Sequence, residues 1–321
     1  MKSTELNWQK QGHIFVPDGT LPWARSHAQV PLALPLNDDV LRIYYGTRDE
    51  QNRTRTSFID VNPRQPQEIN YIHPVPILEL GSPGTFDDAG VMPSAVVNKD
   101  GLIYFFYVGW NVGHKIRYRT ALGLAVSEDG GLTFKRVQEK PVLDRVAPDP
   151  LSTSCQSILI ENGIWRSWYM SYTHWQMRGD VNEPFYHIKY AQSQDGINWL
   201  RENRICIDLK EGEGGIACPS VLKLGNQYIM WYSRRGSGDY RLNPDQSYRI
   251  GMAISDDGLE WQRRDAAAGI DISTAGWDAN MIAYPDVTRN GDELRMLYNG
   301  NDFGRTGFGY AKAQLNNGKR K

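Results

Sequence analysis

The stretch that decides the fold lies in the second half of the chain: Cys218-Pro219-Ser220-Val221-Leu222, followed by Tyr228-Ile229-Met230-Trp231-Tyr232. It predicts a short apolar strand, a tight turn at Gly225-Asn226 and a strand rich in aromatic residues. The same arrangement occurs four more times, and the five copies are marked by Pro31, Pro93, Gln156, Pro219 and Pro285. Successive markers are 62, 63, 63 and 66 residues apart. A unit of several strands that recurs at such a period indicates the blades of a β-propeller.

A second element recurs later in three of the units. It consists of a third strand, a Ser-x-Asp-Gly turn and a fourth strand that opens with an aromatic residue. The turns span residues 127–130, 193–196 and 255–258. An aspartate in such a turn can accept hydrogen bonds from the backbone of its own turn. We therefore expect Asp129, Asp195 and Asp257 to be structural rather than catalytic.

The last unit stops before a fourth strand, and the N-terminus offers a replacement. Leu6-Asn7-Trp8 is similar to Ile197-Asn198-Trp199, which opens a fourth strand in the third unit. We expect residues 6–16 to supply the missing outer strand and to close the ring. The prediction is an all-β, five-bladed propeller that forms one domain over residues 1–321. Its blades are expected at about 28–80, 90–143, 153–209, 216–272 and 281–315 plus 6–16, following the repeat.

The charge balance and cysteine content of the sequence bear on its binding partners and its location. The 321 residues include 36 Lys and Arg against 37 Asp and Glu, so the net charge is −1. This balance argues against nucleic acid and membrane surfaces as partners, because both attract an excess of basic charge. Three cysteines, Cys155, Cys206 and Cys218, give no disulfide framework, which favours a cytoplasmic location. Cys155 and Cys218 begin innermost strands, where we expect them to pack in the core.

The strand order also predicts where a site lies. The segment before each innermost strand and the loop after each second strand share one face of the ring. These segments are longer and more polar than the turns of the opposite face, so we expect function there, around the central channel. Carboxylates, amides and tryptophans on one face suit a carbohydrate. The alternative is that these loops are polar only because solvent surrounds them.

Two parts of the repeat resemble a known group of enzymes. Pro219-Ser220-Val221 and Ser193-Gln194-Asp195-Gly196-Ile197-Asn198-Trp199, within the fivefold strand pair, resemble the propellers of glycoside hydrolase families 43, 32 and 130. The resemblance covers nearly the whole chain and implies an enzyme that cleaves glycosidic bonds with paired carboxylates. Families 43 and 32 place an aspartate directly before the proline or asparagine of an innermost strand. The residues at that position here are not acidic: Val30, Met92, Cys155, Cys218 and Tyr284.

The nearest carboxylates lie in the segments that precede the innermost strands. We predict Asp88, Glu213 and Asp278 as the catalytic carboxylates. Glu213, beside a glycine-rich stretch, is expected to be the proton donor, and Asp88 or Asp278 the base or nucleophile. A separation of about 5 Å between the two carboxyl groups predicts retention of configuration, and about 6.5–9.5 Å predicts inversion.

The loops also supply candidates for binding the substrate. The predicted substrate-binding residues are His27, Arg48, Asp49, Trp110, His174, Arg234 and Trp277. Every loop after a second strand contains arginine, whose planar fork suits a carboxylate or phosphate. This pattern gives the hypothesis of an anionic ligand: an acidic sugar, a sugar phosphate or phosphate itself. The alternative is that these arginines pair with neighbouring aspartates.

We predict that the protein requires no cofactor and has no metal site, because the histidines lack the spacing of metal ligands. The alternative is a single structural cation bound in the channel. A glycoside hydrolase acting on an acidic or phosphorylated sugar is the leading hypothesis for function. The missing acids beside the innermost prolines favour a non-catalytic carbohydrate-binding propeller. Two further hypotheses are a glycoside phosphorylase and a scaffold that binds another protein. Two acids within about 10 Å of each other in the channel mouth would favour the enzyme.

Overall fold

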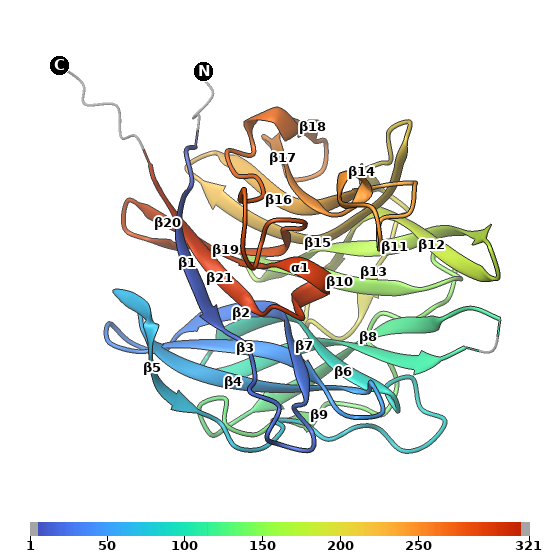
Figure 1. Cartoon of the computed structure of the whole chain (residues 1–321). Helices are drawn as coiled ribbons and strands as arrows, with labels where there is room; N and C mark the ends of the chain where they lie inside the picture. The colour runs from blue at the N-terminus through green and yellow to red at the C-terminus, as the bar shows by residue number, and fades with distance from the viewer. Residues whose placement is uncertain (1–5, 114, 316–321) are drawn as a thin grey trace.

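The computed structural model describes residues 6–113 and 115–315 and shows the five-bladed β-propeller that the repeat predicts (Figure 1). The innermost strands are β2 (Ser26–Pro35), β6 (Gly90–Lys99), β10 (Thr153–Glu161), β15 (Glu213–Leu224) and β19 (Ala283–Asn290). The second strands are β3 (Leu41–Arg48), β7 (Leu102–Val112), β11 (Ile164–Arg178), β16 (Gln227–Gly236) and β20 (Glu293–Asn299). Each second strand pairs with its innermost strand in antiparallel register, which makes each repeated hairpin the inner half of a blade.

The outer halves of the blades are more varied. The third strands are β4 (Thr54–Asn62), β8 (Tyr118–Ser127), β12 (Val181–Ser193), β17 (Arg249–Ser255) and β21 (Phe308–Gln314). The outermost strands are β5 (Gln65–Ile72), β9 (Lys135–Arg136), β13 (Trp199–Leu200), β14 (Ile205–Ile207), β18 (Gln262–Arg263) and β1 (Gln9–Phe15). Helical segments are η1 (Pro244–Gln246), η2 (Asp265–Ala267) and α1 (Asn301–Gly304). Among the described residues, no helix has the length and apolar character needed to cross a membrane.

The N-terminal strand closes the ring, as the sequence predicts. β1 runs antiparallel to β21, from the pair Gln9 and Lys312 to the pair Phe15 and Phe308, so the first described strand is the outermost strand of the last blade. In Figure 1 the blue β1 lies beside the red β21. No seam of unpaired strand edges is therefore left between the first and last described strands.

The Pro-Ser motif of the innermost strands joins neighbouring blades. Ser94, Ser157 and Ser220 each accept a hydrogen bond from a backbone N–H of the next innermost strand, at 2.8–2.9 Å. Asp286 occupies the same position in blade five and accepts from Ala33 N at 2.7 Å. These side chains replace the backbone ladder that innermost strands of different blades cannot form with each other.

A carboxylate ties the inner and outer parts of each of four blades; it is buried in blades two, three and five and half-buried in blade four. In blade two, Tyr107 Oη donates to Asp87 at 3.0 Å, and Arg136 donates to the same carboxylate at 2.8 Å. In blade four, Tyr232 Oη and Arg263 Nη2 donate hydrogen bonds to the carboxylate of Asp265 at 2.5 Å and 2.8 Å. We call this arrangement the Asp–Tyr–cation staple.

Blades three and five repeat the staple with the same spacing in sequence. Tyr169 donates to Asp149 at 2.8 Å, and Tyr298 donates to Asp278 at 3.1 Å. The aspartate lies 20 residues before the tyrosine in both blades, as it does in blade two. The cations are Lys189 and Arg201 in blade three and Lys10 in blade five. The outer-strand cations stand two residues after an aromatic, in the pairs Phe134 and Arg136, Trp199 and Arg201, Trp261 and Arg263, and Trp8 and Lys10. In these four blades the aromatic that opens the outer strand is therefore followed, two residues later, by the cation of the staple.

The Ser-x-Asp-Gly turns have the structural role that the sequence predicts. Asp195 Oδ1 accepts hydrogen bonds from the backbone N–H groups of Ile197 and Asn198, both at 2.8 Å. Asp129 and Asp257 accept bonds from the backbone of their own turns in the same way. Hydrogen bonds to the ionised form outweigh desolvation and lower the pKa of Asp257.

Replacing Lys10 by Met tests whether the staple closes the ring. Asp278 is 2% exposed and pairs with Lys10 at 2.7 Å, so Lys10→Met leaves a buried carboxylate without its cation. We expect the free energy of unfolding to fall by about 3 kcal/mol, measured by urea denaturation. Lys99→Met is the control, because Lys99 pairs with the exposed Asp100 and its loss should leave stability unchanged within error. Equal stability of the two variants would contradict the role of the staple.

Candidate functional site

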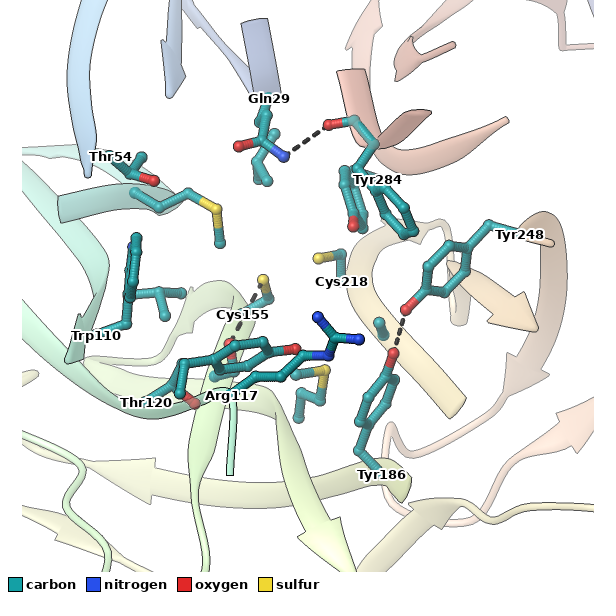
Figure 2. Close-up of a pocket in the computed structure, with 18 of the residues that line it drawn as sticks. Gln29, Thr54, Trp110, Arg117, Thr120, Cys155, Tyr186, Cys218, Tyr248 and Tyr284 are labelled. Carbon is teal, nitrogen blue, oxygen red and sulfur yellow. Dashed lines mark hydrogen bonds between the residues drawn. The ribbon is translucent and has the colours of Figure 1, made fainter. Parts of the chain in front are cut away.

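A cavity of about 490 Å³ lies at the mouth of the central channel. Its wall is built by the starts of the innermost strands and by the segments that follow the second strands, where the sequence predicts a site. Figure 2 shows side chains that point into this space from all five blades: Gln29, Trp110, Cys155, Cys218 and Tyr284. The volume is in the range of small-molecule sites, roughly 300–1,000 Å³.

Three arginines, Arg48, Arg117 and Arg241, line the cavity. Glu183 pairs with Arg117 at 3.2 Å and with Arg241 at 3.4 Å. Arg48 donates to Gln29 Oε1 at 3.1 Å, and it forms no ion pair with a carboxylate anywhere in residues 6–113 and 115–315. Burial lowers the pKa of Arg48, and the charge of Arg241 adds to this effect. Three guanidinium groups against one carboxylate make this part of the wall electropositive.

Eight aromatic side chains also line the cavity: Trp110, Tyr118, Tyr172, Tyr186, Tyr240, Tyr248, Tyr284 and Phe303. The hydroxyls of Tyr186 and Tyr248 share a hydrogen bond (Figure 2). Arg235 Nε donates to Tyr186 Oη at 2.9 Å. Tyr240 Oη donates to Glu183 at 2.7 Å. Burial raises the pKa of Tyr240 and of Tyr248 well above the usual range, so both are neutral phenols. The wall thus offers flat apolar rings with hydroxyl groups at their edges.

Two glycines make room for these rings. A Cβ atom on Gly90 would lie 1.7 Å from Trp110 Nε1, and a Cβ atom on Gly215 would lie 2.2 Å from the ring of Tyr186. Both glycines are in innermost strands, directly beside the aromatic residue that they admit. Larger side chains at these positions would push Trp110 and Tyr186 out of their places in the wall.

The floor of the cavity is a ring of residues that we call the waist: Val30, Cys155, Cys218 and Tyr284. These four also line a second cavity of about 160 Å³, which is enclosed only by the five innermost strands. Val30, Cys218 and Tyr284 have positive φ values of 49°, 45° and 56°. Such a value is unusual for the β-branched Val30, whose N–H is held by Asn299 Oδ1 at 2.7 Å. Strained backbone of this kind gathers at functional sites.

The three carboxylates predicted as catalytic do not line this cavity, and none of its described lining residues is Asp or Glu. Asp88 accepts a hydrogen bond from Gly84 N at 2.8 Å within its own loop. Glu213 pairs with Arg263 at 2.6 Å, and Asp278 belongs to the staple of blade five. The three side chains lie in blades two, four and five, each held by partners that do not line the cavity.

The predicted substrate-binding residues divide into two groups. Arg48 and Trp110 line the cavity. The other five do not. His27 accepts or donates a hydrogen bond of 2.8 Å with Ser26, and Asp49 is buried with Arg53 at 2.8 Å from its carboxylate.

His174, Arg234 and Trp277 also lie outside the lining. The exposed ring of His174 stacks on Phe185 with 4.3 Å between ring centroids. Trp277 stacks on Tyr298 at 5.2 Å, beside the staple of blade five, which gives it a packing role.

Several lining residues were not predicted, and part of the signal was present in the sequence. Tyr186 and Tyr248 each stand seven residues before the serine of a Ser-x-Asp-Gly turn, at Ser193 and Ser255. Tyr186 lies within β12 and Tyr248 directly before β17, and both side chains line the cavity. Arg241 lies in the long loop after β16, where no local pattern indicates which side chain turns inward.

The described residues contain no group of three or more His, Cys, Asp and Glu side chains arranged to hold a metal ion.

Comparison with solved structures shows that the fold is similar to the five-bladed propellers of glycoside hydrolases. It is similar to a structure of BT0996 that is described as an RGII complex (15% identity, TM-score 0.72, 97% of this sequence and 92% of that one). It is also similar to a structure from work on "the GH130 family of mannoside phosphorylases" (15%, TM-score 0.71, 97% and 95%). A thermostable family-43 glycoside hydrolase matches with 18% identity and a TM-score of 0.62, over 91% and 90% of the two sequences. At these identities the similarity concerns the fold.

Closer relatives occur in Mycobacterium tuberculosis. Uncharacterized protein MT1551 of strain CDC 1551 / Oshkosh and Uncharacterized protein Rv1502 of strain H37Rv are each 37% identical to this protein over 308 residues. The match spans 95% of this sequence and 99% of each relative. This protein belongs to the same family as these two. No family model matches it.

His27 next to the cavity gives a prediction for the dependence of stability on pH. Burial lowers the pKa of His27 to about 3, and the charges of Arg48 and Arg305 add to this effect. Below a pH of about 6.5 the unfolded chain binds a proton here that the native protein does not, so the free energy of unfolding falls as pH falls. His27→Asn, which tolerates the positive φ of 65° at this position, removes the proton-binding group.

We expect urea denaturation at pH 6.5, 5.5 and 4.5 to show a shallower loss of stability in His27→Asn than in the parent protein. Measurements at pH 7.5 and 8.5 are the control, because His27 is neutral in both states there and the difference between the proteins should be constant. Parallel curves from pH 6.5 to 4.5 would contradict the lowered pKa.

Proposed function

We propose that the cavity binds an anionic carbohydrate, a sugar that carries a carboxylate or a phosphate group. The observation that carries the proposal is the make-up of the wall: three guanidinium groups, eight aromatic side chains and no carboxylate among the described lining residues. Small-molecule sites combine mostly apolar walls with a few polar groups that fix orientation, and this wall follows that pattern.

Arg48 supports an anionic ligand most directly. It is half-buried, its pKa is lowered by burial, and among the described residues its guanidinium pairs with no carboxylate. A buried charge without a partner is costly, so a ligand anion at this position would be stabilised by the charge that it neutralises. A carboxylate or phosphate also fits the two parallel N–H groups of a guanidinium.

Arg117 and Arg241 extend the positive wall beyond Arg48. Both face the single carboxylate of Glu183, which is 5% exposed and also accepts from Tyr240. One carboxylate cannot neutralise two guanidinium groups, so this side of the cavity keeps a net positive charge. An anion bound between Arg48 and Arg241 would be attracted by the charges of all three arginines.

The aromatic wall supports a sugar as the rest of the ligand. The C–H face of a sugar ring can pack on Trp110, and the hydroxyls of Tyr118 and Tyr172 lie at the cavity wall, where they can exchange hydrogen bonds with sugar hydroxyls. One structural neighbour is described as a complex with RGII, which is consistent with a carbohydrate on this fold.

Hydrolysis by a pair of carboxylates is not part of this proposal. That chemistry needs two carboxyl groups about 5–9.5 Å apart on either side of the bond. Asp88, Glu213 and Asp278 could take part only by leaving their present partners, which for Asp278 would break the staple that closes the ring. A carbohydrate-binding propeller is therefore the function that this geometry supports best.

Phosphorolysis is the second candidate. Arg48 is suited to inorganic phosphate as well as to a sugar phosphate, and one structural neighbour comes from work on the GH130 family that concerns both mannoside phosphorylases and glycoside hydrolases. Incubation of the protein with oligosaccharides, with and without phosphate, separates the two candidates: release of a sugar 1-phosphate only when phosphate is present would establish phosphorolysis.

Titration calorimetry with matched neutral and anionic sugars tests the proposal. The panel contains glucose, galactose, glucuronate, galacturonate and glucose 6-phosphate. We expect the anionic members to bind more tightly, and Arg48→Gln to weaken their binding by about tenfold or more, as for the loss of a charged hydrogen bond. Neutral sugars should lose little affinity.

Arg305→Gln is the matched control, because Arg305 is exposed in the loop after β20 and does not line the cavity. It should retain the affinity of the parent protein for every sugar. If Arg48→Gln reduced neutral and anionic binding equally, or if the parent bound both classes equally, the anionic ligand would be excluded.

A further inference from the structure

The waist brings together two of the three cysteines of the protein. Cys155 in β10 and Cys218 in β15 each directly precede the residue that marks their repeat, so they occupy equivalent positions in blades three and four. The two innermost strands are neighbours, joined by the hydrogen bond from Val221 N to Ser157 Oγ at 2.9 Å. Both cysteines are free thiols.

The two thiols face the same space. Both line the large cavity and the small cavity beneath it, and both point into the floor between Gln29 and Tyr186 in Figure 2. They also belong to one cluster of packed side chains, together with Met170. A molecule that enters the large cavity therefore reaches both sulfur atoms, although little of either side chain is exposed.

Hydrogen bonding makes the two sulfurs unequal. The Cys218 thiol and the Ser154 hydroxyl, which lies 3.9 Å from Cys155 Sγ, both act on Cys155 and lower its pKa. Burial raises the pKa of Cys218 well above the usual range. A hydrogen bond from Ser154 Oγ to Cys155 Sγ stabilises a thiolate there, and the thiolate is the nucleophile in thiol chemistry, so we assign Cys155 as the attacking sulfur and Cys218 as the resolving one.

Cys206 provides the contrast within the same protein. It lies in β14, at the outer side of blade three, packed among Trp168, Ile188 and Tyr228. It lines neither cavity, and burial raises its pKa to about 12. Cys206 is thus a buried cysteine with neither access nor a partner thiol among the described residues.

We propose that Cys155 and Cys218 form a redox-active dithiol at the waist, which a small disulfide that enters the cavity oxidises to a disulfide between blades three and four. The Cys155 thiolate attacks one sulfur of the small disulfide and releases the other half as a thiolate, which takes up the proton that Cys155 lost. The Cys218 thiol then loses its proton and attacks Cys155 Sγ, and the second half leaves as a thiol. Two electrons and two protons pass from the protein to the small disulfide.

Closing this bond would change the cavity in a definite way. The two sulfur atoms would move toward each other across the floor, and the innermost strands β10 and β15 would be linked covalently. The cross-link spans a loop of 62 intervening residues, between positions 155 and 218, so it should stabilise the native fold against unfolding. The redox state of the waist would thereby be coupled to the shape of the ligand site.

The test uses the full-length protein with bis(2-hydroxyethyl) disulfide as the oxidant. After incubation, free thiols are alkylated in denaturant and the protein is digested for mass spectrometry without reduction. We expect a peptide pair joined through Cys155 and Cys218, a loss of two mass units from the intact protein, and full alkylation of Cys206. Non-reducing electrophoresis should show a monomer.

Two single variants identify the roles of the sulfurs. Cys218→Ser should stop at a mixed disulfide on Cys155 that carries one half of the reagent, whereas Cys155→Ser should react at least tenfold more slowly than the parent. Both variants should keep the circular dichroism spectrum of the folded protein, which shows that a loss of reaction is not a loss of fold.

Three results would overturn the proposal: no oxidation of Cys155 and Cys218 while the protein stays folded, equal oxidation of Cys206, or a disulfide between two protein molecules in place of the one within a molecule. These readouts do not depend on carbohydrate binding, so the dithiol and the sugar site can fail separately.

Discussion

The structure depends on the buried carboxylate that joins a second-strand tyrosine to a cation of the outer blade. A carboxylate such as Asp278, which is 2% exposed, is tolerable only with a cation and hydrogen-bond donors beside it. In blade five that cation is Lys10, which lies near the opposite end of the sequence from Asp278. The ion pair that neutralises this buried carboxylate therefore also links β1 to the segment before β19, at the place where the ring closes.

This constraint also explains the chemistry of the central cavity. Two of the acids near the starts of the innermost strands are held by arginines, Asp87 in the staple by Arg136 and Glu213 by Arg263. The positions that face the channel are occupied instead by apolar and sulfur-containing side chains at the waist. Since the carboxylates of the blades are neutralised within the blades, the arginines of the rim, above all Arg48, determine the charge of the cavity wall. A balanced total charge is compatible with this local excess.

The fold could be predicted from the sequence because its signals are local and repeated. A marker such as Pro219, a tight turn and an aromatic strand recur five times, and Trp8 repeats the aromatic of an outer strand. The lining of the cavity was predictable only where position alone decides it, as for Arg48 and Trp110. The ion pairs that hold Glu213 and Asp278 outside the cavity lining could not be predicted, because the sequence shows that an acid is near the channel but not which cation pairs with it. The partners of these acids are 50 and 268 residues away in the chain.

The central claim is that guanidinium groups, not carboxylates, receive the ligand in the channel mouth. A crystal structure of the protein with glucuronate tests this most directly. We predict density for the sugar in the cavity, with its carboxylate on Arg48, its ring beside Trp110, and the ion pair of Asp278 with Lys10 intact. A sugar held instead by Asp88, Glu213 or Asp278, with these side chains freed from their present partners, would contradict the account.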